Sequence, residues 1–239
     1  MTRFSFETIA ADCAAFGVPL ENGLAERLAF YGEQLLVWNE KMNLTAITAP
    51  EEVVIKHFYD CLLFFKRVEV PQGARVIDVG TGAGFPGMVL KLARPDLTVT
   101  LLDSLQKRLT FLEEVIGGLG LTGITTVHMR AEDAGHAPAL REGFEIACAR
   151  AVAALPVLAE YCLPLVKPGG VFVAMKGTSA EQEAAEAQNA IRLLGGAAPE
   201  VAPEQLPGGE KRAFITVKKI SQTPTKYPRK PKEMAKQPL

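Results

Sequence analysis

A cluster of closely spaced glycines could bring a ligand directly onto the main chain. The glycines follow residues 75–79, a short apolar run with one carboxylate at Asp78, and they are Gly80, Gly82, Gly84 and Gly87. Glycine permits positive φ and close approach to the backbone, and free N–H groups at a helix start favour an electron-rich group. We therefore expect a nucleotide-like ligand above residues 80–84. A tight turn without a ligand is the alternative, because glycine loops often follow strands.

Polar residues after the next apolar runs extend this candidate site. Asp103 lies about 20 residues beyond the glycines, where a carboxylate can accept hydrogen bonds from both ribose hydroxyls of a nucleotide. Its alternative role is the N-cap of a helix that begins near Gln106. Ala131 and Glu132 could hold an adenine edge or form an ordinary capping turn. Arg150 follows an apolar strand, where a cation is costly unless an anionic or aromatic group meets it, so we predict a ligand or substrate role for it.

The sequence predicts that these residues are positioned by strands separated by helices. The predicted strands span residues 75–79, 98–102, 124–129, 144–149, 171–175 and 211–220. Helical runs of about 10 to 15 residues between them predict an α/β fold with a doubly wound, mostly parallel sheet. Ligands bind beyond the carboxyl ends of the strands in such sheets.

Three segments are expected along the chain. Residues 1–72 form an N-terminal helical cap with one helix that buries a face of apolar residues three and four apart and another that begins at Pro50. Residues 73–220 form the core, in which 195–210 are a loose connection. Residues 221–239 hold four prolines among lysines and are expected to be an extended basic arm, neither helix nor central strand.

Composition narrows the class of protein. The 239 residues carry a net charge of −1, 22% of them are charged, and no apolar run approaches a membrane span. The first residues lack a signal-peptide pattern, so we expect a cytoplasmic protein without a membrane partner. The four cysteines and three histidines are scattered, which predicts neither disulfides nor a metal site.

The glycine spacing discriminates between cofactors. A dinucleotide loop has the pattern G-x-G-x-x-G, and a phosphate loop ends in Gly-Lys, but neither pattern is present. The compact form D-x-G-x-G-x-G, in which Thr81 separates the first two glycines, is typical of methyltransferases that use S-adenosylmethionine.

Several further motifs resemble one family. They are GTGAGFPG, NLTAIT with KHFYD, LLDSLQKR, RAEDAG, CARAVAALP, LVKPGG, MKG and TPTKYPRKP. From about Trp38 to Leu239 the chain resembles the bacterial small-subunit ribosomal RNA guanine-N7 methyltransferases, also called glucose-inhibited division protein B. The resemblance implies a Rossmann-like class I methyltransferase that methylates N7 of one guanine in the decoding region of 16S ribosomal RNA. The implied cofactor-binding residues are Gly80, Thr81, Gly82, Gly84, Phe85, Asp103, Ala131, Glu132 and Arg150.

The implied reaction needs no general base. N7 of guanine has an exposed lone pair and no proton, so we expect positioning groups instead of a catalytic dyad. His57 is expected to pack or to hydrogen-bond within the cap, and no catalytic residue is assigned. RNA would be held through its phosphates. Lys218 to Leu239 contain seven Lys or Arg and one acidic residue, Glu233.

The candidate RNA contacts carry alternatives of their own. These candidates are Asn43, Lys176, Lys226, Arg229 and Lys230. A solvated tail, a turn asparagine and a lysine after a strand are equally simple explanations, and Tyr227 could stack on a base or pack on the sheet. The RNA partner could be naked 16S RNA, a 30S subunit or an assembly precursor.

Two other functions stay open. A small-molecule or protein methyltransferase would use the same loop, and a nucleotide-binding or ribosome-assembly protein could retain the fold without transferring methyl groups. The basic C-terminus argues against small substrates, and the complete loop with Asp103 argues against a protein that transfers nothing.

Overall fold

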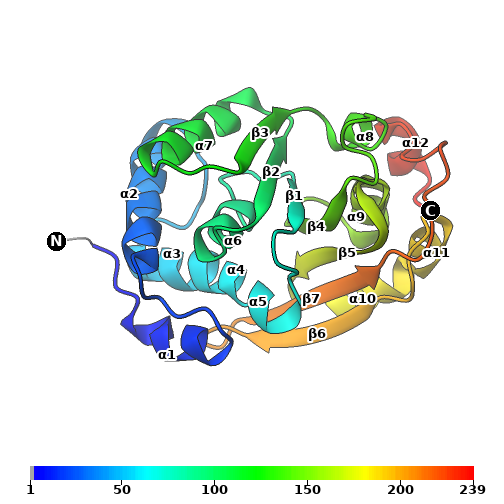
Figure 1. The fold of residues 1–239 in the computed structure, drawn as a ribbon. Coiled ribbons are helices and arrows are strands. Elements are labelled where there is room, and N and C mark those ends of the chain that lie inside the picture. The colour runs from blue at the N-terminus through cyan, green and yellow to red at the C-terminus, as the bar shows by residue number, and fades with distance from the viewer. Residues whose placement is uncertain (1–2) are drawn as a thin grey trace.

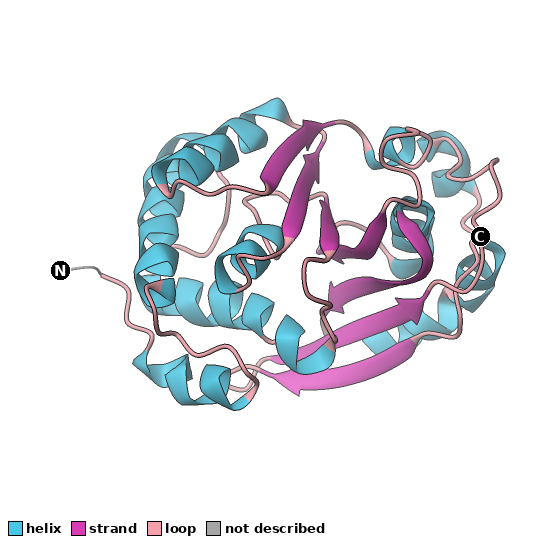
Figure 2. Ribbon diagram, viewed as in Figure 1, coloured by secondary structure: helices cyan, strands magenta, loops and turns pink. Residues whose placement is uncertain are grey.

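A seven-stranded sheet forms the centre of the computed structural model, which describes residues 3–239 (Figures 1 and 2). Met1 and Thr2, assigned to the predicted cap, lie outside the described residues. The strand order is β3-β2-β1-β4-β5-β7-β6, and β7 and β6 are the antiparallel members. The strands are β1 (Arg75–Val79), β2 (Thr98–Asp103), β3 (Ile124–His128), β4 (Phe144–Arg150), β5 (Val166–Lys176), β6 (Glu200–Gln205) and β7 (Lys211–Lys218). The predicted doubly wound, mostly parallel sheet is confirmed.

The strand order reverses at β1, which lies between β2 and β4. Val79 pairs with Leu102, so the glycine loop after β1 begins beside the end of β2. A reversal of this kind leaves a crevice beyond the carboxyl ends of the neighbouring strands, where ligands bind in open α/β sheets. The topology therefore selects the edge of the sheet that carries the predicted site.

Two apolar layers cover the sheet because successive side chains of a strand point to opposite faces. Val76 belongs to one buried cluster with helices α6 (Gly87–Ala93) and α7 (Gln106–Gly118). Its neighbour Ile77 belongs to the other cluster. The helices of that second cluster are α9 (Leu155–Cys162), α10 (Ala180–Glu186) and α11 (Gln188–Leu193), with the 3-10 turn η2 (Leu163–Leu165) and the short α8 (Ala131–Ala134).

The N-terminal helices share the first apolar cluster with the sheet. They are α1 (Glu7–Ala15), α2 (Leu24–Met42), α3 (Pro50–Val53), the π-helix η1 (Val54–Tyr59), α4 (Asp60–Leu62) and α5 (Phe64–Arg67). Leu28, Tyr31 and Leu35 of α2 are fully buried, which confirms the helix predicted from their spacing. The division of the chain into three segments stays a prediction.

Two sequence predictions about the second half of the chain are wrong. Strand β6 lies within the predicted loose connection, and its Pro203 is tolerated because β6 is an edge strand that pairs only with β7. The expected extended arm contains the helix α12 (Pro231–Lys236), in which proline occupies the first turn. Tyr227 and Met234 are buried, so this segment packs on the body of the protein.

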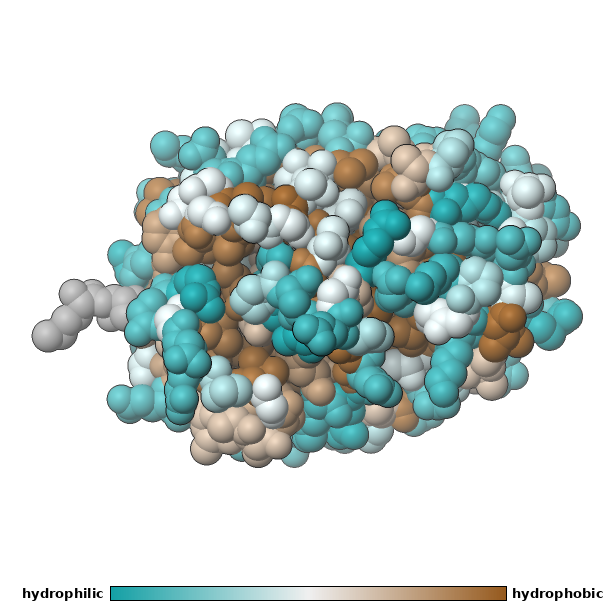
Figure 3. Space-filling view, viewed as in Figure 1, coloured by the Kyte–Doolittle hydropathy of each residue, from teal (hydrophilic) through white to brown (hydrophobic). Residues whose placement is uncertain are grey.

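The surface of the protein is mixed in character. Hydrophilic side chains border patches of apolar surface over the face shown in Figure 3. None of the helices within residues 3–239 is long and apolar enough to cross a membrane.

Candidate functional site

A cavity of about 350 Å³ opens at the carboxyl ends of β1, β2 and β3. Four of the nine predicted cofactor-binding residues line it, namely Gly80, Asp103, Ala131 and Glu132. The volume falls in the roughly 300–1,000 Å³ range of small-molecule sites. We call this space the first cavity.

Backbone geometry explains the glycines of the loop. Gly80 has a φ of +68°, and a Cβ atom there would lie 2.8 Å from Cγ2 of Val152 on the opposite wall. Gly84 has a φ of +98°, and a Cβ atom would lie 2.5 Å from the Tyr31 hydroxyl oxygen. Only glycine fits both the conformation and the space at these positions.

Most main-chain amides of the loop are not open to a ligand, contrary to expectation. The amides of Gly80 and Thr81 donate to the carbonyl oxygen of Leu102, at 2.8 and 3.0 Å. Those of Gly84 and Phe85 donate to the carbonyl oxygen of Thr81. Internal hydrogen bonds therefore fix the shape of the loop. Gly80 has no side chain, so its main chain itself forms part of the cavity wall.

Asp78 ties the two ends of the loop together beneath the cavity. Its Oδ2 accepts hydrogen bonds from the Thr81 hydroxyl at 2.6 Å and from the Gly87 amide at 2.8 Å. The carboxylate is fully buried, and this burial raises its pKa to about 6. Thr81 is buried as well and does not line the first cavity, so it acts as part of this tether.

Asp103 faces the first cavity and also orders the turn after β2. Its Oδ1 accepts the Leu105 amide at 2.9 Å, and its Oδ2 accepts the Gly82 amide at 2.9 Å and a longer 3.3 Å contact from Arg108. A carboxylate has about four lone-pair sites, so acceptor capacity is left for a ligand hydroxyl. The N-cap of α7 is Leu105, which excludes the simple capping role considered for Asp103.

A second cavity of about 350 Å³ shares one lining residue, Ala151, with the first. Arg150 and Lys176 line this second cavity with Lys56, His57, Asp60 and Arg212. Ala151 has a φ of +55°, a left-handed conformation that costs roughly 1–3 kcal/mol in a residue other than glycine. The turn after β4 thus places a strained backbone in the lining of both cavities.

Arg150 is held by a network within the second cavity. Its guanidinium donates to Asp60 Oδ2 at 3.0 Å and to the ring nitrogen Nδ1 of His57 at 3.1 Å, and it lies 4.9 Å from the centre of the Phe85 ring. Anionic and aromatic partners were expected for this cation, and the chain itself supplies them. Arg150 lines the second cavity and not the first, and its predicted cofactor contact stays a prediction.

His57 is a neutral, hydrogen-bonded member of the same network. Burial, together with the nearby charge of Arg150, lowers the pKa of His57 to about 3. Because Nδ1 accepts from Arg150, Nε2 carries the proton and donates to the Thr45 hydroxyl at 2.9 Å. The ring stacks on Phe85 with 4.5 Å between the ring centres. Phe85 is buried and is not among the residues that line the first cavity, so its predicted cofactor contact stays a prediction.

The predicted loop residues Gly82 and Gly84 also lie outside the lining of the first cavity. Gly82 contributes through its hydrogen bond to Asp103, and Gly84 through its packing on Tyr31. The sequence did not single out Val152 or Tyr161, which complete the first cavity. The motif KHFYD contains His57 and Asp60 and was the available signal for the second cavity.

The predicted RNA contacts are not brought together. Lys176 lines the second cavity and pairs with Glu183 at 2.7 Å. Asn43 is exposed at the end of α2, whereas Lys226 and Lys230 are exposed in the C-terminal segment. Arg229 is not the free cation expected there, because Glu160 accepts its hydrogen bonds at 2.8 and 2.9 Å. Tyr227 is buried, so it packs within the fold.

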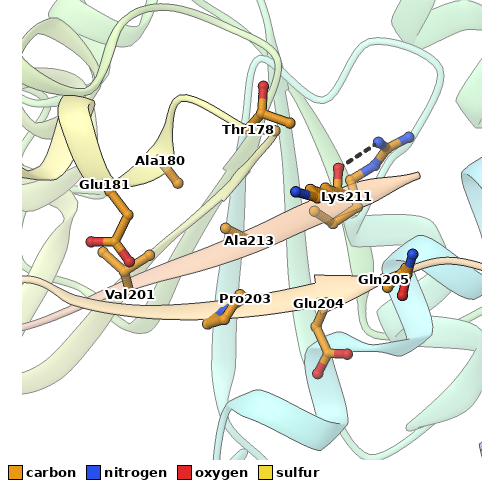
Figure 4. A pocket seen from close by; sticks show the side chains of 11 residues that line it. Thr178, Ala180, Glu181, Val201, Pro203, Glu204, Gln205, Lys211 and Ala213 are labelled. Carbon is orange, nitrogen blue, oxygen red and sulfur yellow. Dashed lines mark hydrogen bonds between the residues drawn. The ribbon is translucent and has the colours of Figure 1, made fainter. Parts of the chain in front are cut away.

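A third cavity, of about 460 Å³, lies between the start of α10 and the β6–β7 hairpin. Figure 4 shows Thr178 and Glu181 on one side and Val201 and Pro203 on the other. It contains no residue of the glycine loop. Within residues 3–239, no group of three or more His, Cys, Asp and Glu side chains is arranged to hold a metal ion.

Together, the reversed sheet, the glycine loop after β1 and the carboxylate that ends β2 define the Rossmann-like fold of class I S-adenosylmethionine-dependent methyltransferases. Solved structures agree on this fold. The S-adenosylmethionine-dependent O-methyltransferase of Thermotoga maritima matches with a TM-score of 0.54 and 17% identity over 80% of this chain and 72% of that one. The YcgJ protein of Bacillus subtilis matches with a TM-score of 0.53 and 14% identity over 69% and 100%.

The sequence comparisons identify the family. Residues 24–206 match the family model described as rRNA small subunit methyltransferase G. The ribosomal RNA small subunit methyltransferase G of Alkaliphilus metalliredigens is 48% identical over 95% of both chains. That of Acetivibrio thermocellus is 49% identical over 95% of this chain and 93% of its own. The chain therefore belongs to the rRNA small subunit methyltransferase G family.

Proposed function

We propose that this protein transfers a methyl group from S-adenosylmethionine to N7 of one guanine in 16S ribosomal RNA. Membership of the rRNA small subunit methyltransferase G family supports the enzyme class and the RNA substrate. The choice of guanine N7 comes from the motif resemblance. The observation that carries the proposal is that Ala151 lines both cavities, because a transfer reaction needs a donor site and an acceptor site close together.

The residues of the first cavity fit S-adenosylmethionine. Gly80 lines the cavity with main chain alone, and Asp103 keeps acceptor capacity for ribose hydroxyls. Ala131 and Glu132 lie on the wall assigned to the adenine. When bound, the cofactor supplies an electrophilic methyl group on a sulfonium centre.

The second cavity is the proposed acceptor site. Arg150, Lys176 and Arg212 line it, each paired with a carboxylate, and their N–H groups are the donors that suit the O6 edge of guanine or a neighbouring phosphate. Since N7 has no proton, these residues need only orient the base. The base must leave its stack to enter, as for other enzymes that modify bases.

The proposal is tested by labelled methyl transfer. The protein is incubated with methyl-labelled S-adenosylmethionine and with naked 16S RNA, with 30S subunits lacking the modification, or with free guanosine nucleotides. Modified positions are then mapped by borohydride reduction and aniline cleavage. We expect label at one guanine of the RNA in the naked or the assembled sample, and the sample that is labelled identifies the form recognised.

Two outcomes would overturn the proposal. Absence of label from every RNA sample would exclude methyl transfer to RNA. Label found only in a small molecule or a protein would favour a different methyl acceptor. An RNA substrate of this kind also leads us to propose that the protein works in the cytoplasm.

A further inference from the structure

The C-terminal segment, residues 221–239, lies against the wall of the first cavity that is formed by α8. Figure 1 shows α12 beside α8 at one end of the sheet. The Arg141 guanidinium joins the two parts. It donates hydrogen bonds to the carbonyl oxygens of Gly135 at 2.6 Å, Tyr227 at 2.9 Å and Thr223 at 2.7 Å. A single side chain thus binds the loop after α8 to the C-terminal segment.

Two further contacts hold the loop after α8 against the same segment. His136 Nε2 lies 2.7 Å from the carbonyl oxygen of Pro228, so this ring nitrogen carries the donated proton. Gly135 is packed so closely that a Cβ atom would lie 2.6 Å from the Pro228 ring. The contact leaves no space for a larger residue or for a solvent layer.

Helix α9 is fastened by the segment as well. The Arg229 main-chain amide and Nε donate to Oε1 of Glu160, at 2.7 and 2.9 Å, and its NH2 group donates to Oε2 at 2.8 Å. Glu160 is only 1% exposed, and bidentate pairs of this kind have a defined geometry. The next residue, Tyr161, lines the first cavity.

The cavity wall between these anchors is thin. Arg130 and Glu132 line the first cavity and also a space of about 870 Å³ whose far side is formed by residues 228–233. Helix α8 has only four residues, too few to be stable without tertiary contacts. Its position therefore depends on the contacts that Gly135 and His136, at its C-terminal end, make with the C-terminal segment.

We propose that the C-terminal segment is a positioning element of the cofactor site. It would set the place of α8 and α9, and through them Glu132 and Tyr161, without touching the cofactor itself. Arg141 is the central positioning residue because its four carbonyl contacts, with Gly135 after α8 and with Thr223, Pro224 and Tyr227 of the segment, join both sides. The inference rests on the proposed binding of S-adenosylmethionine in the first cavity. It differs from the expectation that this segment serves RNA binding alone.

The test is the cofactor affinity of Arg141→Ala, measured by calorimetry with S-adenosylhomocysteine and with methylthioadenosine, which retains the adenosyl part. We expect both dissociation constants to rise by roughly tenfold and in parallel, which corresponds to about 1.4 kcal/mol. Arg192→Ala removes a surface arginine of α11, bonded to Asn189, and serves as the matched control. Its affinities should equal those of the wild type.

A second measurement does not depend on cofactor. Amide hydrogen exchange within residues 131–136 should become faster in Arg141→Ala and stay unchanged in Arg192→Ala. Truncation after Ser221 should weaken cofactor binding in the same way, and a peptide of residues 222–239 should restore it. The KM for RNA of Arg141→Ala, measured at saturating cofactor, should stay within twofold of wild type.

The outcomes separate this inference from the proposed function. If Arg141→Ala binds both ligands within twofold of wild type, the positioning role is wrong while the proposed function stands. If wild-type protein binds neither ligand, the cofactor assignment fails and the positioning role fails with it. An unchanged exchange rate within residues 131–136 would also contradict the positioning role, even if the truncated chain does not fold.

Discussion

At the scale of single residues, the charged groups of the site are mostly paired with one another. Arg150 meets Asp60, and Lys176 meets Glu183. Of these four residues Asp60 is the buried one, and removing the partner of a buried charge typically costs 3–5 kcal/mol, because the charge is left uncompensated. These residues therefore form a rigid frame, which suits a reaction that needs orientation and no proton transfer to a base.

The first prediction concerns the ribose contact. Asp103→Ala should raise the dissociation constant for S-adenosylhomocysteine by roughly tenfold or more, because hydrogen bonds to a charged acceptor contribute about 1.5–3 kcal/mol each. Isothermal calorimetry measures the change. Asp12→Ala removes a carboxylate that bonds Tyr59 and does not line the first cavity, so it serves as control. Equal affinity for wild type and Asp103→Ala would remove Asp103 from the site.

The second prediction concerns the pH dependence of stability. The pKa of His57 is about 3 in the folded protein and near 6.5 when unfolded, so the unfolded state binds the extra proton between these values. The free energy of unfolding should therefore fall as the pH drops below about 6.5, by up to roughly 1.4 kcal/mol per pH unit from this group. Urea unfolding at pH 7.5 and 5.5 should show a smaller decline for His57→Gln than for wild type. Parallel curves for the two proteins would contradict the buried neutral state.

At the scale of elements, the sequence predicts those strands, helices and loops that have a recognisable local pattern of residues. The strand, glycine loop and second strand from Arg75 to Asp103 are read from apolar runs and glycine spacing, and the structure agrees with them. Strand β6 was missed because its residues, EVAPEQ, form no apolar run and pair at an edge. Helix α12 was missed because prolines and lysines suggested an extended arm.

The candidate site, too, could be predicted only where a local sequence pattern indicates a role. Asp103 and the glycines could be assigned from spacing, but no local pattern indicates that Glu160, far along the chain, accepts the hydrogen bonds of Arg229. Likewise, Phe85 belongs to the loop motif, yet aromatic rings from α2 and η1 bury it. Tertiary partners, which the sequence does not reveal, decide these roles.

The third prediction concerns the glycine loop as an element. Gly84→Ala should lower the melting temperature by roughly 5–10 °C, because the substitution combines a positive φ with overpacking against Tyr31 and Leu112. Gly117→Ala, within helix α7 and with nothing near the added atom, should stabilise by about 0.5–1 kcal/mol. Calorimetric melting of both variants tests the difference. Shifts of the same sign would contradict the packing account.

At the scale of the whole molecule, the site is assembled from distant parts of the chain. The N-terminal helices supply His57 and Asp60, the sheet supplies Asp103 and Arg150, and the C-terminal segment packs behind α8. Only the complete fold brings Ala151 into the lining of both cavities. The central claim is this adjacency of a cofactor cavity and an acceptor cavity.

A crystal structure of the protein with S-adenosylhomocysteine tests this claim most directly. We expect the ligand to occupy the first cavity, with its ribose at Asp103 and its sulfur directed towards Ala151 and the second cavity. Ligand density in the cavity beside the β6–β7 hairpin, or a sulfur atom directed away from Ala151, would contradict it.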